Sequence, residues 1–207
     1  LPTGKGMAAS TADIVAVIQA VATAIDEELE PEEIAEIAAG IEPTDGIFYP
    51  GIVQMNYMTG ELIKSYGNAP KMIIAMFDMG GSINTVEFHS EYHGHEDSPK
   101  ELLEAIDKLD VDFSPRQIAH VATLSALANQ KLVPKPHLEE IIKYSATLGA
   151  LGVNVAHSGT MVGVLFAPDE SMKHVMEAVE KIREKFPELE YFETERLISG
   201  GYDIEQR

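Results

Sequence analysis

The first stretch with the composition of a ligand site lies at the start of the sequence, where a glycine-containing loop runs directly into a helix-forming pattern. Gly4 and Gly6 permit backbone conformations that other residues avoid, and they let a ligand approach the main chain closely. The helix that follows would direct its unpaired amide groups and the positive end of its dipole at the loop. These features predict an anion site that suits phosphate.

Three side chains of the loop support this interpretation. Lys5 supplies a positive charge, and the hydroxyl groups of Ser10 and Thr11 suit a phosphate oxygen or a magnesium ion, which prefers oxygen ligands. The loop is not a Walker P-loop, because in that motif the lysine follows the second glycine, whereas here Lys5 precedes Gly6. Taken alone, the loop is also compatible with a tight connection into an alanine-rich helix.

Two later polar connections contain further candidate residues. The turn at 42–46 carries Glu42 and Asp45, and the connection at 154–160 carries His157 between two apolar runs. Taken singly, these residues also suit a solvated acid, a turn aspartate and a turn histidine. Their value as candidates comes from the order in which the three connections follow one another.

A histidine-rich segment offers an alternative site. His89, His93 and His95 lie among acidic residues in a polar connection, so a zinc or other metal site can be drawn from them. The spacing fits no helical histidine pair, which favours an exposed loop over a metal centre.

Composition and charge limit the classes of partner. With 45% hydrophobic and 24% charged residues, the 207-residue chain is typical of a globular protein with a substantial core. Its formal charge of −19 argues against nucleic acid and against an anionic membrane surface as partners. The absence of cysteine excludes disulfides and thiolate sites. No segment has the pattern of a membrane span or a signal peptide, so we expect a cytoplasmic location.

The elements that must position the candidate residues follow from periodicity. Apolar residues predict a helix over 10–26 with one buried stripe, and Pro31 begins a second helix that ends near Gly40. A hairpin is expected at 52–55 and 61–66. The expected stripe of the first helix consists of Ile14, Ile18, Val21 and Ile25.

Strands and helices alternate in the remainder of the chain, as two-layer α/β proteins require. Capping boxes at Ser98 and Ser114 mark two helix starts. The remaining elements are strands at 72–77, within 151–166 and at 190–197, and helices at 137–148 and 169–185. The sequence therefore predicts an α+β protein with one lobe at 1–68 and a second at 69–207.

The order and content of the three polar connections resemble the regions that define the GHMP kinases, the small-molecule kinases named for galactose, homoserine, mevalonate and phosphomevalonate. The likeness is strongest to the branch of L-threonine kinases linked to cobalamin biosynthesis and propanediol utilisation. It implies a two-lobe GHMP kinase fold, with a ribosomal S5 domain 2-like N-terminal lobe and an α/β-sandwich C-terminal lobe. The N-terminal portion of that fold has no counterpart here, so we expect the first lobe to be incomplete. The similar stretches are 2–13, 42–45, 122–126, 132–136 and 154–159.

The resemblance also implies roles for individual residues. Ser10 matches the serine that reaches Mg²⁺, with Glu42 or Glu36 as a second metal ligand, and Asp45 matches the catalytic acid that orients or deprotonates the substrate hydroxyl. The ATP phosphates would be held by Gly4, Lys5, Gly6, Met7, Ala8, Ala9, Ser10 and Thr11, and the substrate by Asn154, His157, Ser158 and Gly159. Two departures from the family pattern are Ala9, which replaces the first serine of the usual pair, and the single glycine of the late turn.

The function implied is ATP- and magnesium-dependent phosphorylation of a small alcohol, preferably L-threonine to O-phospho-L-threonine. Phosphoryl transfer mainly needs positioned phosphates, neutralised charge and an oriented hydroxyl, which these residue types can supply. Two alternatives are the same fold acting on another alcohol, such as homoserine or a pathway intermediate, and a nucleotide-binding or interaction module without turnover. Neither nucleic acid nor a membrane is an expected partner, and the sequence leaves the oligomeric state open, with a homodimer as one possibility.

Overall fold

The structure is a computed structural model that describes residues 4–81 and 98–201, and the chain divides into two compact units. Among the described residues, the first unit contains 8–69 and 198–201, and the second contains 4–7, 70–81 and 98–197. The division crosses the glycine-containing loop, between Met7 and Ala8. We describe each unit by itself.

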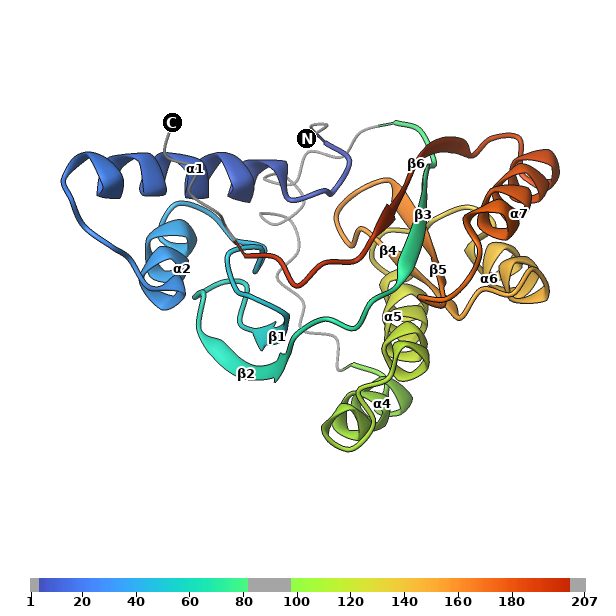
Figure 1. The fold of residues 1–207 in the computed structure, drawn as a ribbon, viewed down its shortest axis with the longest axis horizontal. Helices are drawn as coiled ribbons and strands as arrows, with labels where there is room; N and C mark the ends of the chain where they lie inside the picture. Colours follow the sequence, from blue (N-terminus) through green and yellow to red (C-terminus); the bar gives the residue numbers. More distant parts are fainter. Residues whose placement is uncertain (1–3, 82–97, 202–207) are drawn as a thin grey trace. The chain divides into compact units, whose positions relative to one another are not determined.

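The first unit packs two helices with a two-stranded antiparallel sheet (Figure 1). Its elements are α1 (Ala9–Ala24), α2 (Pro31–Ala39), β1 (Ile52–Met55) and β2 (Leu62–Gly67). Pro31 occupies the first turn of α2, and Glu30 and Glu33 form a reciprocal capping box there that satisfies backbone amides. The buried core is formed by Val15, Ile34, Ala35, Ala38, Phe48 and Tyr49.

The buried line of α1 agrees with the expected stripe only in the first half of the helix. Ile14 and Ile18 are partly buried and pack against the core, whereas Val21 and Ile25 are 55% and 66% exposed. The fully buried residues of the helix are Thr11, Val15 and Ala22. Apolar residues occur on nearly every side of this helix, so its sequence period cannot decide which line faces inward. The core around α2 and Phe48 decides it instead.

The second unit is built on a four-stranded sheet with the order β4-β5-β3-β6, in which all neighbouring strands are antiparallel. The strands are β3 (Ile73–Asp78), β4 (Gly152–Val155), β5 (Met161–Phe166) and β6 (Glu190–Arg196), and the helices are α4 (Lys100–Asp107), α5 (Pro115–Asn129), α6 (Leu138–Thr147) and α7 (Met172–Lys185), with a short 3₁₀ helix at Lys108–Asp110. The expected α+β character is therefore present.

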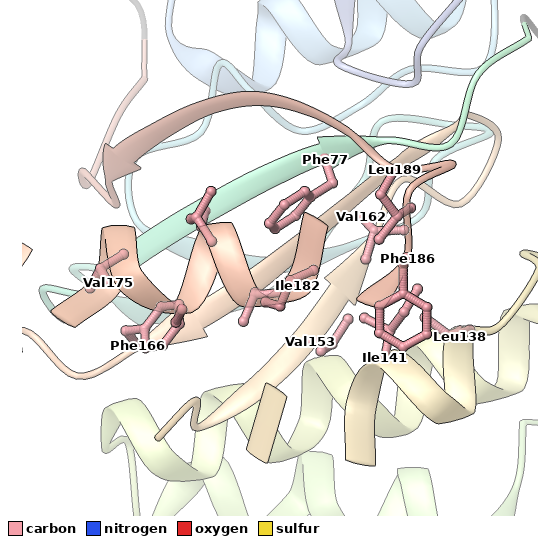
Figure 2. Close-up of a cluster of buried hydrophobic side chains, with 14 of the residues drawn as sticks. Phe77, Leu138, Ile141, Val153, Val162, Phe166, Val175, Ile182, Phe186 and Leu189 are labelled. Atoms are coloured by element: carbon pink, nitrogen blue, oxygen red, sulfur yellow. The ribbon is translucent and has the colours of Figure 1, made fainter. Parts of the chain in front are cut away.

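Helices cover both faces of this sheet. Figure 2 shows Ile182 of α7 and Ile141 of α6 in one buried cluster with Phe77 of β3 and Phe166 of β5. A smaller cluster joins Leu165 to Ala119 of α5 on the opposite face. The side chains of β3 alternate between buried and half-buried, which shows that one face of the sheet is covered more completely than the other at this strand, whereas every residue of β5 is buried.

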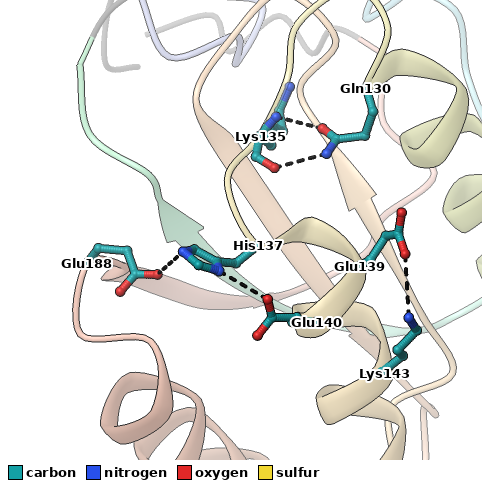
Figure 3. Close-up of polar contacts among 7 residues, drawn as sticks. All are labelled: Gln130, Lys135, His137, Glu139, Glu140, Lys143 and Glu188. Atoms are coloured by element: carbon teal, nitrogen blue, oxygen red, sulfur yellow. Dashed lines mark hydrogen bonds and ion pairs between the residues drawn. The ribbon is translucent and has the colours of Figure 1, made fainter.

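Two details concern helix ends. The Ser114 hydroxyl accepts a hydrogen bond from the Gln117 amide, as expected. The capping box expected at Ser98 is wrong, because α4 begins one residue later, with Pro99 at the N-cap position and no side-chain cap. The connection from α5 to α6 is closed by the amide side chain of Gln130, which bonds both the N–H and the C=O of Lys135 (Figure 3). Among the described residues, no helix combines the length and apolar character needed to cross a membrane.

Candidate active site

The first half of the glycine-containing loop packs within the second unit, against the turn between β4 and β5. The amide of Thr160 donates to the carbonyl of Lys5 at 3.1 Å. Gly6 has φ +76°, and a Cβ placed there would lie 2.6 Å from the Cβ of Ala156 and 2.8 Å from the Cα of Gly159. A Cβ on Gly159 would in turn overlap the backbone of Lys5 and Gly6. Two backbones therefore meet at a separation that only glycine permits.

Lys5 lies at a fixed position in this contact. Its ammonium group is 2.5 Å from a carboxylate oxygen of Asp78, the last residue of β3, and donates to the carbonyl of Gly81 at 2.7 Å. The hydroxyl of Thr160 donates to the other oxygen of Asp78 at 2.6 Å. Burial alone would raise the pKa of Asp78, but hydrogen bonds from Lys5, Thr160 and Gly80, with the charge of Lys5, outweigh burial and hold that pKa below its ordinary value.

Asp78 was not a candidate from the sequence. The only local signal is an acid at the end of an apolar strand, before Gly80 and Gly81, and its two main partners lie 73 and 82 positions away in the sequence. Such long-range pairs leave no periodic pattern.

His157 lies at the tip of the same β4–β5 turn and is anchored from α5. Its ring nitrogen Nε2 lies 3.0 Å from the hydroxyl of Ser125, and its carbonyl accepts from the side-chain amide of Asn129 at 3.1 Å. Ser158 and Gly159 complete the turn, and Asn154 lies on β4, where its side-chain oxygen is buried without a partner among the described residues. Asn129 was not a candidate from the sequence, and Ser125 lay in the family-like stretch 122–126 without an assigned role.

The second half of the loop belongs to the first unit and forms the start of α1. Ala8 is in the left-handed region, and no side chain caps the helix. The amides of the first helical turn have no acceptor within the helix, so the N-terminus retains the character of an anion site.

The turn at 42–46 contacts this helix start. The hydroxyl of Ser10 donates to the carboxylate of Glu42. The buried hydroxyl of Thr11 accepts from the backbone amide of Asp45 at 3.1 Å and from the hydroxyl of Thr44 at 3.3 Å. The candidate acid and the candidate metal ligands therefore converge on the first turn of α1.

Of the two carboxylates considered as a second magnesium ligand, Glu42 is the one that contacts Ser10, while Glu36 lies exposed on α2. Serine hydroxyl and carboxylate oxygens fit the ligand preference of Mg²⁺. Within residues 4–81 and 98–201, histidine and acidic side chains form no group of three suited to a metal ion. The alternative site at His89, His93 and His95 lies outside the described residues.

Two curated relatives are similar in sequence to this chain. L-threonine kinase from Citrobacter freundii is 26% identical over 216 residues, covering 99% of this chain and 73% of the enzyme. L-threonine kinase from Salmonella typhimurium is 26% identical over 170 residues, covering 80% of this chain and 57% of the enzyme. Both alignments leave a part of the longer enzyme without a counterpart here.

Solved structures of other kinases have the same fold. L. major mevalonate kinase in complex with R-mevalonate matches with a TM-score of 0.64 at 18% identity, over 95% of this chain and 66% of that protein. Streptococcus pneumoniae phosphomevalonate kinase in complex with phosphomevalonate and AMPPNP matches with a TM-score of 0.56 at 12% identity, over 88% of this chain and 66% of that protein. The chain thus spans about two thirds of the length of these two kinases.

Two domain models of one family match the chain directly. The GHMP kinases N terminal domain matches residues 1–48, and the GHMP kinases C terminal domain matches residues 102–185. Together they include more than half of the 207 residues. The first match contains the glycine-containing loop and the turn at 42–46, and the second contains both Ser125 and His157. The chain belongs to the GHMP kinase family of small-molecule kinases.

Proposed function

We propose that the protein transfers the terminal phosphoryl group of ATP to the hydroxyl group of a small molecule, with L-threonine as the preferred acceptor and O-phospho-L-threonine as the product. The observation that carries this proposal is the start of α1. There an uncapped helix N-terminus, the Ser10–Glu42 pair and the anchored turn of Asp45 meet within one unit. The arrangement offers amides for phosphate, oxygen ligands for a cation and an acid for a hydroxyl.

The residues have separate parts in this proposal. The backbone amides between Gly4 and Thr11 bind the phosphates, and the dipole of α1 favours the negative charge there. Ser10 and Glu42 would hold Mg²⁺, which neutralises charge on the phosphates when bound. Asp45 orients the acceptor hydroxyl and takes its proton, because its backbone is fixed by Thr11 at the helix start while its side chain is exposed.

The choice of acceptor rests on the relatives. Both curated relatives described above are L-threonine kinases, and their similarity extends over 99% and 80% of this chain. Nucleotide use is supported by the phosphomevalonate kinase structure, which contains AMPPNP. A place in cobalamin biosynthesis or propanediol utilisation and a cytoplasmic location follow from the same resemblance and are part of the proposal.

The test is incubation of the intact gene product with ATP, Mg²⁺ and L-threonine, followed by mass spectrometry for O-phospho-L-threonine. Parallel reactions with L-serine and L-homoserine, monitored by ADP release, rank the acceptors. We expect L-threonine to give the highest kcat/KM and Asp45→Asn to abolish most of the turnover. If ADP release is faster with L-homoserine than with L-threonine, homoserine replaces threonine as the proposed acceptor. If the protein binds MgATP but phosphorylates none of these alcohols, the kinase proposal is replaced by that of a nucleotide-binding module without turnover.

A further inference from the structure

Asp78 joins three separate segments of the second unit through one carboxylate. It ends β3, where its backbone pairs with Met161 of β5 and Glu190 of β6, so its position is set by the centre of the sheet. Its two oxygens accept hydrogen bonds from Lys5, from the Thr160 hydroxyl and from the Gly80 amide at 3.0 Å. These hydrogen bonds link the first half of the glycine-containing loop to the end of β3.

Lys5 is held in the loop by both its backbone and its side chain. Its carbonyl accepts from Thr160, and its ammonium group contacts Asp78 and the Gly81 carbonyl. An ammonium group has three N–H donors. Within the described residues these contacts engage two of them, which leaves one donor for a ligand. Because the long side chain is already ordered, a phosphate that binds it loses less conformational entropy than with a mobile lysine.

Two functions of Asp78 can be separated physically. In the first, its negative charge fixes the ammonium of Lys5, so its effect on nucleotide binding passes through Lys5. In the second, it only shapes the turn at Thr160 and Gly80, which would affect the loop whether or not Lys5 is charged. The short contact with Lys5, in a partly buried setting where charge-assisted bonds are strong, favours the first function.

We propose that Asp78 is a positioning residue for the nucleotide: it holds the ammonium group of Lys5 in the first half of the glycine-containing loop so that the remaining N–H donor binds a phosphate oxygen of ATP. This inference rests on the proposed function, since it needs MgATP as the ligand. It adds a residue that lies 67 positions beyond the loop's last member, Thr11, and that acts through Lys5.

The experiment is titration calorimetry of MgATP into the intact protein and its Asp78→Asn, Lys5→Met and double variants. Asparagine retains an acceptor for the Thr160 hydroxyl while removing the charge that faces Lys5. We expect each single variant to weaken MgATP binding by about tenfold, the size typical of a hydrogen bond to a charged group. The double variant should bind like Lys5→Met alone, because Asp78 acts through Lys5.

Three controls accompany the binding data. Glu139→Gln removes a carboxylate from an exposed ion pair with Lys143 on α6 (Figure 3) and should leave MgATP binding unchanged. Lys5→Arg should retain binding within about threefold, since a guanidinium can also pair with Asp78. In turnover assays, Asp78→Asn should raise the KM for ATP with little change in the KM for threonine, which a general loss of folded protein would not produce.

Independent effects of Asp78→Asn and Lys5→Met that multiply in the double variant would overturn this inference, and so would unchanged MgATP affinity in Asp78→Asn. In either case the unaltered protein still binds MgATP, so the proposed function stands. If the unaltered protein binds no MgATP, both the proposed function and this inference fail. If Asp78→Asn does not fold, the comparison of Lys5→Met with Lys5→Arg tests the inference. An equal loss of MgATP affinity in these two variants would overturn it, because arginine keeps a positive charge that can pair with Asp78.

Discussion

Replacing Lys135 by methionine should stabilise the protein at neutral pH, which is the opposite of the usual result for a buried residue. Lys135 lies between Pro134 and Pro136 in the α5–α6 connection, and its backbone is fixed by Gln130 (Figure 3). Its side chain is buried, and its ammonium nitrogen has no hydrogen-bond partner among the described residues. A buried charge without a partner costs free energy, and methionine keeps the apolar stem without that charge.

The size of the effect follows from the pKa. Burial lowers the pKa of Lys135 from 10.5 to about 8. A shift of this size corresponds to at most about 3 kcal/mol of free energy against the charged form. Relaxation and water entry reduce that value, so we expect a gain of about 1–2 kcal/mol for Lys135→Met at pH 7, or roughly 3–6 °C in Tm for a protein of this size.

The pH dependence of the unfolding free energy is an independent check on the sign of this effect. Between pH 8 and pH 10.5 the unfolded chain binds more protons at Lys135 than the folded chain does, so the contribution of this residue to stability rises with pH across that window. Below pH 8 both states are protonated and the penalty is complete. The advantage of Lys135→Met should therefore be largest at pH 7 and shrink as pH approaches 10.5.

The assay is urea unfolding followed by circular dichroism at pH 7, 8, 9 and 10 for both proteins. Lys181→Met, at an exposed position of α7, is the matched control and should shift stability little at any pH. A variant that is less stable than the unaltered protein, by the same amount at pH 7 and pH 10, would refute the reasoning, because the amine would then have a partner that stabilises its charge.

Three further predictions concern the candidate site. Asp45→Asn should lower kcat by about 10²- to 10⁴-fold with a small change in MgATP affinity, and unchanged kcat in a steady-state assay would remove Asp45 from the mechanism. Ser10→Ala should raise the Mg²⁺ concentration needed for half-maximal rate, and an unaltered Mg²⁺ titration would exclude the hydroxyl as a ligand. Gly6→Ala should weaken MgATP binding and lower Tm by more than Gly67→Ala, because both glycines have positive φ but only Gly6 faces neighbouring atoms within 4 Å; equal Tm losses would contradict the close backbone contact.

The local parts of the fold were predictable from the sequence. Pro31, the Ser114–Gln117 cap and the apolar run before Asp78 act over a few residues, and the helices and strands they predict are present within two or three residues of the expected ends. The three loops could also be found, because glycine and small polar residues interrupt apolar patterns at the ends of elements. Their physical causes are local, so one sequence is sufficient.

The rest depended on contacts between distant parts of the chain. Glu42 and Glu36 are equally plausible carboxylates until α1 and the following turn are packed, since only packing brings Ser10 to one of them. Asp78 and Ser125 were missed for the same reason, because their partners are selected by the sheet and by α5. The expected stripe of α1 was wrong at Val21 and Ile25, because apolar residues on most sides of a helix do not determine which side is buried.

The sequence of the glycine-containing loop alone was weak evidence for a ligand site, whereas its contacts in the folded protein are stronger evidence. Its first half has a close contact with the β4–β5 turn that excludes any side chain at Gly6 and Gly159, which a simple connection into a helix does not require. Its second half places Ala8 at φ 54°, a left-handed conformation that costs an alanine about 1 kcal/mol. A chain that needed only a turn there would be more stable with glycine at position 8. The strained alanine and the two crowded glycines support the proposal that the direction of the loop's backbone matters, as a site that binds phosphate through its amides requires.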